Sequence, residues 1–178
     1  MVMGDESLDR NDHADFVGCA EIVRRQAETL AVFRAAEAAG DWSTIHEGHY
    51  DWWMFPIDQP SSHGYAWTVY PGDIDELIAT PGFLSDYLDG ARILLVSWGW
   101  DMETRRFVDD PAPDQDWQDW PIRLEKCGRS LWLFAQQGAE GAQRAYGSAR
   151  EYATVLVARG VSMRYRDRDC WHFFRDHH

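Results

Sequence analysis

The stretch of sequence that decides the fold runs from Phe83 to Gly99 and reads FLSDYLDGARILLVSWG. Its apolar residues recur every three or four positions, the spacing of one helix face, at Leu84, Tyr87, Leu88, Ala91, Leu94, Leu95 and Trp98. Residues 93–98 alone would also suit a buried β-strand. Because the helical spacing begins well before them and continues unbroken, the sequence favours a helix that ends at Gly99.

Two helices are expected before this stretch. The first covers 14–39 and ends at a glycine, which can take a positive φ. Asp41 or Ser43 caps the second, which carries residues 46–54 and ends before Pro56, because proline pushes its predecessor out of the helical region. A loop then follows, in which residues 65–70 form at most one short extended segment.

Asp73 and Glu76 resemble a capping box that opens a short helix ending at Ala79. After residue 99, helical spacing returns twice, from Trp120-Pro121 to Phe134 and over 142–159. The sequence therefore predicts an all-α, single-domain bundle of five to six helices over 14–178. Residues 1–13 are acidic and lack an apolar stretch, so they are expected to form a flexible tail and neither a signal peptide nor a membrane anchor.

The chain of 178 residues carries a net charge of -13. This charge opposes nonspecific binding to nucleic acid and to anionic membranes, and it fits either solubility alone or a basic protein partner. The three cysteines have no paired spacing typical of zinc or redox sites. We therefore expect a soluble cytoplasmic protein without a cofactor, and the excess of arginine over lysine is typical of a bacterium with a GC-rich genome.

Residues 46–56 read HEGHYDWWMFP and combine two histidines, an aspartate and several aromatic residues. On one helix, His46 and His49 would share a face and could act as two ligands of a divalent metal. The alternative is that one imidazole packs or caps while the other forms hydrogen bonds. The spacing is not that of a zinc protease motif, and two histidines are too few ligands without others from elsewhere in the chain.

Ten tryptophans are more than a core of this size needs, so we expect some of them to line a ligand-binding cleft. The candidates stand beside predicted helix ends and are Trp52, Trp53, Trp98, Trp100, Trp117 and Trp120. Asp101 and Arg123 follow two of these clusters, where they either orient a polar ligand group or form an ion pair between helices. The alternative for the tryptophans is that they fill the core.

His49 and Asp51 are the best candidates for catalytic residues, with His49 as a general base that a carboxylate orients. Asp109, Asp110, Asp114, Asp116 and Asp119 belong to an acidic loop without the glycine and glutamate of a calcium-binding loop. Arg164, Arg166 and Arg168 would share one face of an extended segment. That small basic strip either binds an anion or pairs with the protein's own carboxylates.

Three pieces in order resemble the conserved N-terminal domain of the opioid growth factor receptor family, which has bacterial relatives. They are 49–56 with its histidine, tryptophan and Phe-Pro, 83–99 with its aliphatic helix, and 122–134 with its arginine-bearing leucine-rich helix. The chain differs from the family pattern at Trp52 and Met54 and lacks its His-Asn pair. The resemblance implies an all-α domain and no reaction.

The sequence thus predicts an acidic helical protein whose tryptophan-lined cleft binds a small ligand or a protein partner, in the manner of an inhibitor or immunity protein. The alternative is a small enzyme that uses His49 and Asp51, with or without metal, on an aromatic or cationic substrate.

Overall fold

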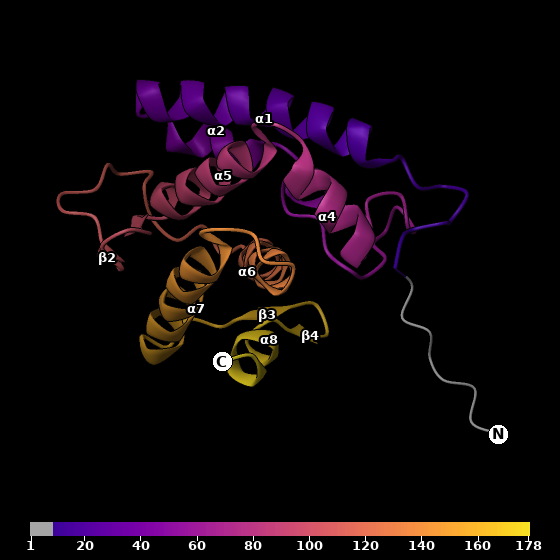
Figure 1. Ribbon diagram of the computed structural model, residues 1–178. Helices are drawn as coiled ribbons and strands as arrows, with labels where there is room; N and C mark the ends of the chain where they lie inside the picture. The colour runs from indigo at the N-terminus through magenta and orange to yellow at the C-terminus, as the bar shows by residue number, and fades with distance from the viewer. Residues whose placement is uncertain (1–8) are drawn as a thin grey trace.

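A computed structural model describes residues 9–178, and it is mostly helical. These residues contain eight helices and two small two-stranded antiparallel sheets (Figure 1). The helices are α1 (Cys19–Ala39), α2 (Trp42–Glu47), α3 (Asp51–Met54), α4 (Pro71–Ala79), α5 (Phe83–Ser97), α6 (Pro121–Gln136), α7 (Ala142–Ala158) and α8 (Trp171–Asp176). The sheets pair β1 (Trp100–Asp101) with β2 (Arg106–Phe107) and β3 (Arg164–Tyr165) with β4 (Arg168–Asp169).

The helix α5 confirms the expected helical reading of residues 93–97. Its apolar side packs beneath α1 and above α7, as Figure 1 shows, and buries Tyr87, Ala91 and Leu94 completely. Gly90 lies where α5 approaches α3, and a Cβ atom there would come 2.6 Å from Met54 Cε. A side chain at position 90 would therefore require the terminal methyl group of Met54 to move.

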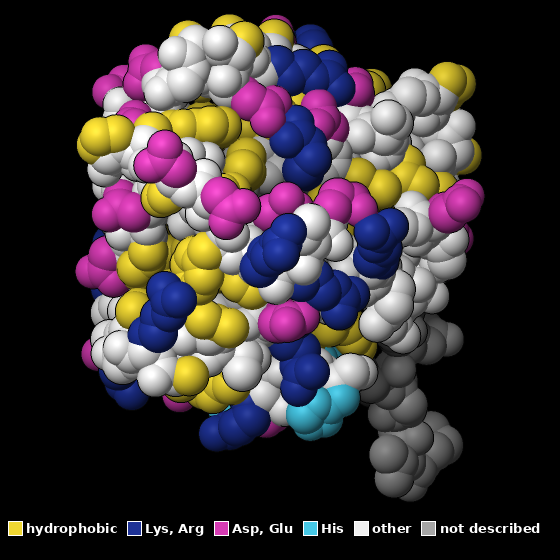
Figure 2. Space-filling model, turned by 90° about the vertical axis from the view of Figure 1, so that its left-hand side faces the viewer, with side chains coloured by type: hydrophobic (Ala, Val, Ile, Leu, Met, Phe, Trp, Pro, Cys, Tyr) yellow, Lys and Arg dark blue, Asp and Glu magenta, His cyan; other side chains and the backbone are white. Residues whose placement is uncertain are grey.

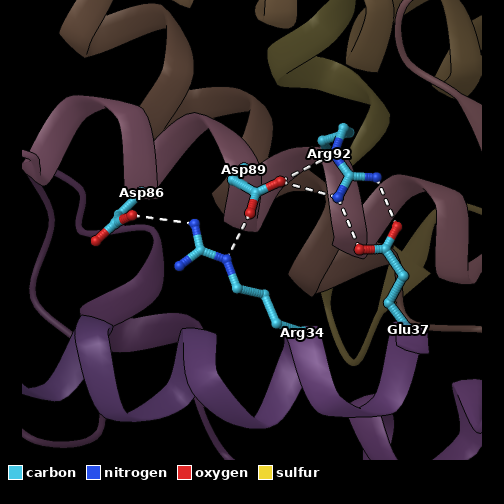
Figure 3. A network of polar contacts seen from close by, with 5 residues as sticks. All are labelled: Arg34, Glu37, Asp86, Asp89 and Arg92. Atoms are coloured by element: carbon cyan, nitrogen blue, oxygen red, sulfur yellow. Dashed lines mark hydrogen bonds and ion pairs between the residues drawn. The ribbon is translucent and has the colours of Figure 1, made fainter. Parts of the chain in front are cut away.

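An ion-pair network joins the outer edges of α1 and α5 (Figure 3). The Arg92 guanidinium donates from both terminal nitrogens to Glu37, at 2.7 and 2.8 Å, and it also pairs with Asp89. Arg34 donates to Asp89 at 2.8 Å and to Asp86 at 3.1 Å. The network aligns the two helices at the rim of their apolar contact.

The second half of the fold consists of α6 and α7, which pack against each other, and α8, which contacts both. Alanines at 142, 145, 149 and 153 are buried on α7 and let it approach α6 closely. Gly128 of α6 lies against the ring of Phe174 in α8, and a Cβ atom there would overlap that ring. The C-terminal residues thus dock on the helices.

Three expected boundaries differ from the structure. The helix expected over 14–39 begins at Cys19, and the helix expected over 46–54 is divided at Gly48, whose ψ of 162° is extended. The helix expected from Asp73 begins at Pro71, because the Asp73 carboxylate accepts a 3.0 Å hydrogen bond from the Tyr70 amide. Asp73 therefore occupies the third helical position and not the cap.

Residues 9–13 are packed, although they were assigned to the tail. The Asn11 amide donates to Asp73 at 2.8 Å, and its side chain donates to the carbonyls of Tyr65 and Thr68. Residues 65–67 form turns and residues 68–70 have no regular structure, so no strand is formed over the expected extended segment. Residues 1–8 of the predicted tail lie outside the described part. Among the described helices, none has the length and apolarity needed to cross a membrane.

Candidate functional site

A pocket with a volume of about 460 Å³ lies among the described residues. Four segments form it: α3, the loop over 55–67, the first turn of α6 and the β3–β4 hairpin. The hairpin lies next to α6 in Figure 1. A pocket of this volume is in the range that accommodates a small-molecule ligand.

Aromatic side chains make up much of the pocket wall. They are Trp52, Phe55, Trp67, Trp120 and Tyr165. Trp52 and Trp120 come from two of the expected clusters, and both are half-buried. Indole rings with part of their surface exposed offer flat apolar faces to a ligand.

Four cationic side chains and one carboxylate also line this pocket: Arg123, Lys126, Arg166, Arg168 and Asp51. Lys126 is the single lysine of the chain. Its Nζ donates to Asp51 Oδ2 at 2.5 Å and lies 4.9 Å from the centre of the Trp52 ring. Arg168 pairs with the buried carboxylate of Glu125 and donates to Gln59 at 3.3 Å. Two of the four cations are therefore compensated by carboxylates.

Arg123 is held without a carboxylate. The residue is 3% exposed. Its guanidinium donates hydrogen bonds to the carbonyls of His46 at 3.1 Å and of Gly48 at 2.8 Å. The guanidinium carbon lies 4.0 Å from the Trp120 ring centre and 4.7 Å from that of Tyr50. No carboxylate among residues 9–178 lies within 4.0 Å of it. Backbone dipoles and ring faces thus stabilise a buried cation at the pocket wall.

The proposed catalytic pair does not form a hydrogen-bonded unit. Both His49 and Asp51 line the pocket, but His49 is exposed and packs only loosely against Trp52, with ring centres 6.1 Å apart. Asp51 is bound to Lys126, and the described hydrogen bonds do not link it to His49. Asp51 therefore orients the lysine and not the imidazole.

His46 turns away from His49, because the chain is extended at Gly48. Its ring stacks on Trp98, and its Nε2 lies 3.0 Å from Ser97 Oγ. Burial and, to a smaller extent, the charge of Arg123 together lower the pKa of His46 to about 4. In the part of the chain described, no group of three or more His, Cys, Asp or Glu residues is placed to hold a metal. The two histidines thus lack the shared face that the predicted metal site required.

Three of the predicted ligand-binding tryptophans lie elsewhere. Trp98 and Trp100 are 1% and 2% exposed and pack with Trp117 around Tyr152, between α5 and α7. Trp100 Nε1 donates to Ser148 at 3.0 Å. These rings belong to the hydrophobic core, as in the alternative prediction that the tryptophans fill the core and do not line a ligand-binding cleft.

Trp53 and Asp101 also lie outside the main pocket. Trp53 Nε1 donates to Thr29 at 2.8 Å, and its ring borders a smaller hollow of about 170 Å³ beside Phe33 and Tyr50. Asp101 accepts the amides of Glu103 and Thr104 in the β1–β2 turn, and these bonds lower the pKa of its carboxyl. It does not pair with Arg123.

Sequence reasoning missed several pocket residues: Gln59, Trp67, Lys126 and Tyr165. Lys126 was detectable, because it stands one helical turn after Arg123 and so shares its face. Arg166 and Arg168 were detected as a basic strip, but no sequence signal placed this strip against α6. In the structure the strip is a hairpin with Arg166 in its turn, at a φ of 53°.

No protein-family model matches the chain, and neither curated proteins nor solved structures gave a significant match. The resemblance to the opioid growth factor receptor domain therefore stays a prediction, and the geometry of the pocket carries the functional argument.

Proposed function

We propose that this protein binds a small molecule in the pocket between α3, α6 and the β3–β4 hairpin. One observation carries the proposal: aromatic rings and cationic groups from four separate segments line a single pocket of about 460 Å³. Pockets that bind small ligands have this composition, with apolar walls and a few fixed polar groups. We also propose a single helical domain in a reducing compartment such as the cytoplasm, supported by three buried, unpaired cysteines.

The test is a ligand screen followed by substitution of one wall residue. Trp52 lines the pocket and Trp132 does not, yet both are half-buried tryptophans. For hits detected by ligand-observed NMR, Trp52→Leu should weaken binding by about tenfold or more, because a ring contributes stacking and apolar contact. Trp132→Leu serves as the matched control. Equal affinity of the two variants for every hit contradicts the proposal.

A basic protein partner is the alternative in the binding class, supported by the net charge of -13. The face drawn in Figure 2 gives it little support, because acidic and basic side chains are intermixed there with hydrophobic ones. Such a partner would be steered by a continuous acidic surface. Capture of basic proteins that persists in Trp52→Leu would favour this alternative.

An enzyme that uses His49 and Asp51 is the alternative in the catalytic class. The pocket location of both residues supports it, and the engagement of Asp51 by Lys126 opposes it. Turnover of a pocket ligand that is lost in His49→Gln while binding is retained would establish this role.

A further inference from the structure

We infer that the ligand of this pocket is an aromatic anion whose carboxylate or phosphate is held by Arg123 and Arg166. This inference rests on the proposed ligand-binding function and adds the charge and chemical class of the ligand. Both arginines line the pocket, and within residues 9–178 neither has a carboxylate partner at ion-pair distance. The other two cations of the pocket already have such partners.

The burial of Arg123 makes its missing counter-ion significant. A buried charge is costly unless it is paired and hydrogen-bonded. The Arg123 guanidinium donates two hydrogen bonds to carbonyl groups, and no carboxylate of the described residues lies within 4.0 Å of it. A planar carboxylate or phosphate matches the guanidinium fork and supplies that charge.

The start of α6 adds to the positive potential. This helix of 16 residues begins at the pocket with Pro121 and has no acidic residue in its first turn. Pro121 has no N–H, and the amides of Arg123 and Leu124 donate to the Trp120 carbonyl, so it is the helix dipole that favours an anion beside Ile122 and Arg123. The carboxylates that usually offset such a helix end are absent from the sequence of that turn.

The aromatic rings oppose a cationic ligand. Attraction of a cation to these rings would require a free ring face. One face of Trp120 is covered by Arg123, and Lys126 lies over Trp52. Arg123 and Lys126 would therefore repel a ligand cation placed beside these rings, whereas an uncharged aromatic body can stack on the ring surface that remains.

The experiment compares ligands that share one aromatic body and differ in the charge and chemistry of the attached group. Naphthylacetate, naphthyl phosphate, naphthylethanol and naphthylethylamine would be titrated by calorimetry, together with matched acid, alcohol and amine sets from an aromatic fragment library. We expect the acids or phosphates to bind at least about tenfold more tightly than the matched alcohols, and the preference to shrink at high salt. The amines should bind most weakly.

Two arginines of one hairpin provide the matched substitution. Arg166 and Arg164 are both exposed, but only Arg166 lines the pocket. Arg166→Gln should weaken acid binding by about threefold to tenfold and leave alcohol binding unchanged, whereas Arg164→Gln should change neither. Arg123→Lys keeps the positive charge but loses the two parallel N–H donors of the guanidinium, so it should reduce the preference for acids. Circular dichroism would check that this variant is folded.

The outcomes separate the two claims. Alcohols that bind as tightly as acids, with both sensitive to Trp52→Leu, overturn the anionic class and leave the ligand-binding function standing. Acids that bind equally well to Arg166→Gln and Arg164→Gln also overturn the inference. If no member of the library binds in a manner sensitive to Trp52→Leu, the proposed function fails, and the inference fails with it.

Discussion

At the scale of single residues, His46 shows how burial changes chemistry. Its Nε2 faces Ser97 Oγ, whose own proton is donated to the Leu94 carbonyl at 2.6 Å. The imidazole must therefore donate from Nε2, which leaves Nδ1 buried without a partner. A neutral His46 fits this arrangement, and a charged one would face Arg123 without compensation.

This geometry predicts a pH dependence of stability. The pKa of His46 is lowered to about 4 in the folded state from an ordinary value of 6.5. Its contribution is thus fully present above pH 6.5 and is lost as the pH falls toward 4. His46→Asn should remove about 1–2 kcal/mol of pH dependence in this window, as measured by urea unfolding. His172→Asn, an exposed control, should keep the slope of the wild type.

Gly128 is a second residue whose effect can be predicted. Because a Cβ atom would overlap Phe174, Gly128→Ala should destabilise the protein by about 1–3 kcal/mol by displacing α8. Gly147→Ala is the helical control, since its Cβ would meet only the mobile end of Arg105 at 3.0 Å. Chemical denaturation would measure both, and equal stability of the two variants would refute the packing of α8 on α6.

At the scale of elements, the α1–α5 network in Figure 3 is mostly half-exposed. Each ion pair therefore contributes less to the free energy of unfolding than its short distance suggests. Arg92→Met should cost about 1 kcal/mol, because it removes the bidentate bond to Glu37, and high salt should reduce this cost. Arg24→Met, whose partners are within its own helix, should cost about 0.5 kcal/mol or less. Costs that do not depend on salt would contradict this assignment.

The elements also show how far the sequence could predict the structure. Periodicity identified the long helices α1, α5, α6 and α7, because the apolar spacing of each helix is visible in its own local sequence. The break at Gly48 was missed because glycine is tolerated inside helices, and because Arg123, far along the chain, binds the carbonyls that the break exposes. The two hairpins of two-residue strands have no periodic signal at all.

The candidate site was predictable only in part, for the same physical reason. Residue types pointed to His49, Asp51, Trp52, Trp120 and Arg123, and all five line one pocket. The burial of Trp98 and Trp100 depends on α7, which contributes Ser148 and Tyr152 to their surroundings. Local sequence does not contain that information, so core and cleft tryptophans looked alike.

At the scale of the whole molecule, a chain with a net charge of -13 concentrates four cations around one pocket. This contrast between the molecule and its pocket is the basis of the proposed anion specificity. Because an anionic ligand would bind only the folded state, a saturating aromatic acid should raise the unfolding temperature in proportion to the logarithm of its concentration. Differential scanning calorimetry would measure this shift, and a smaller shift in Trp52→Leu than in Trp132→Leu at the same ligand concentration would place the ligand in the pocket.

The most direct test of the central claim is a crystal structure of the protein with a bound aromatic acid from the calorimetric screen. The account predicts the aromatic body between Trp52 and Trp120, with the acid group within hydrogen-bonding distance of Arg123 or Arg166. An acid bound outside this pocket, or bound in it with its charged group directed away from both arginines, would contradict the account.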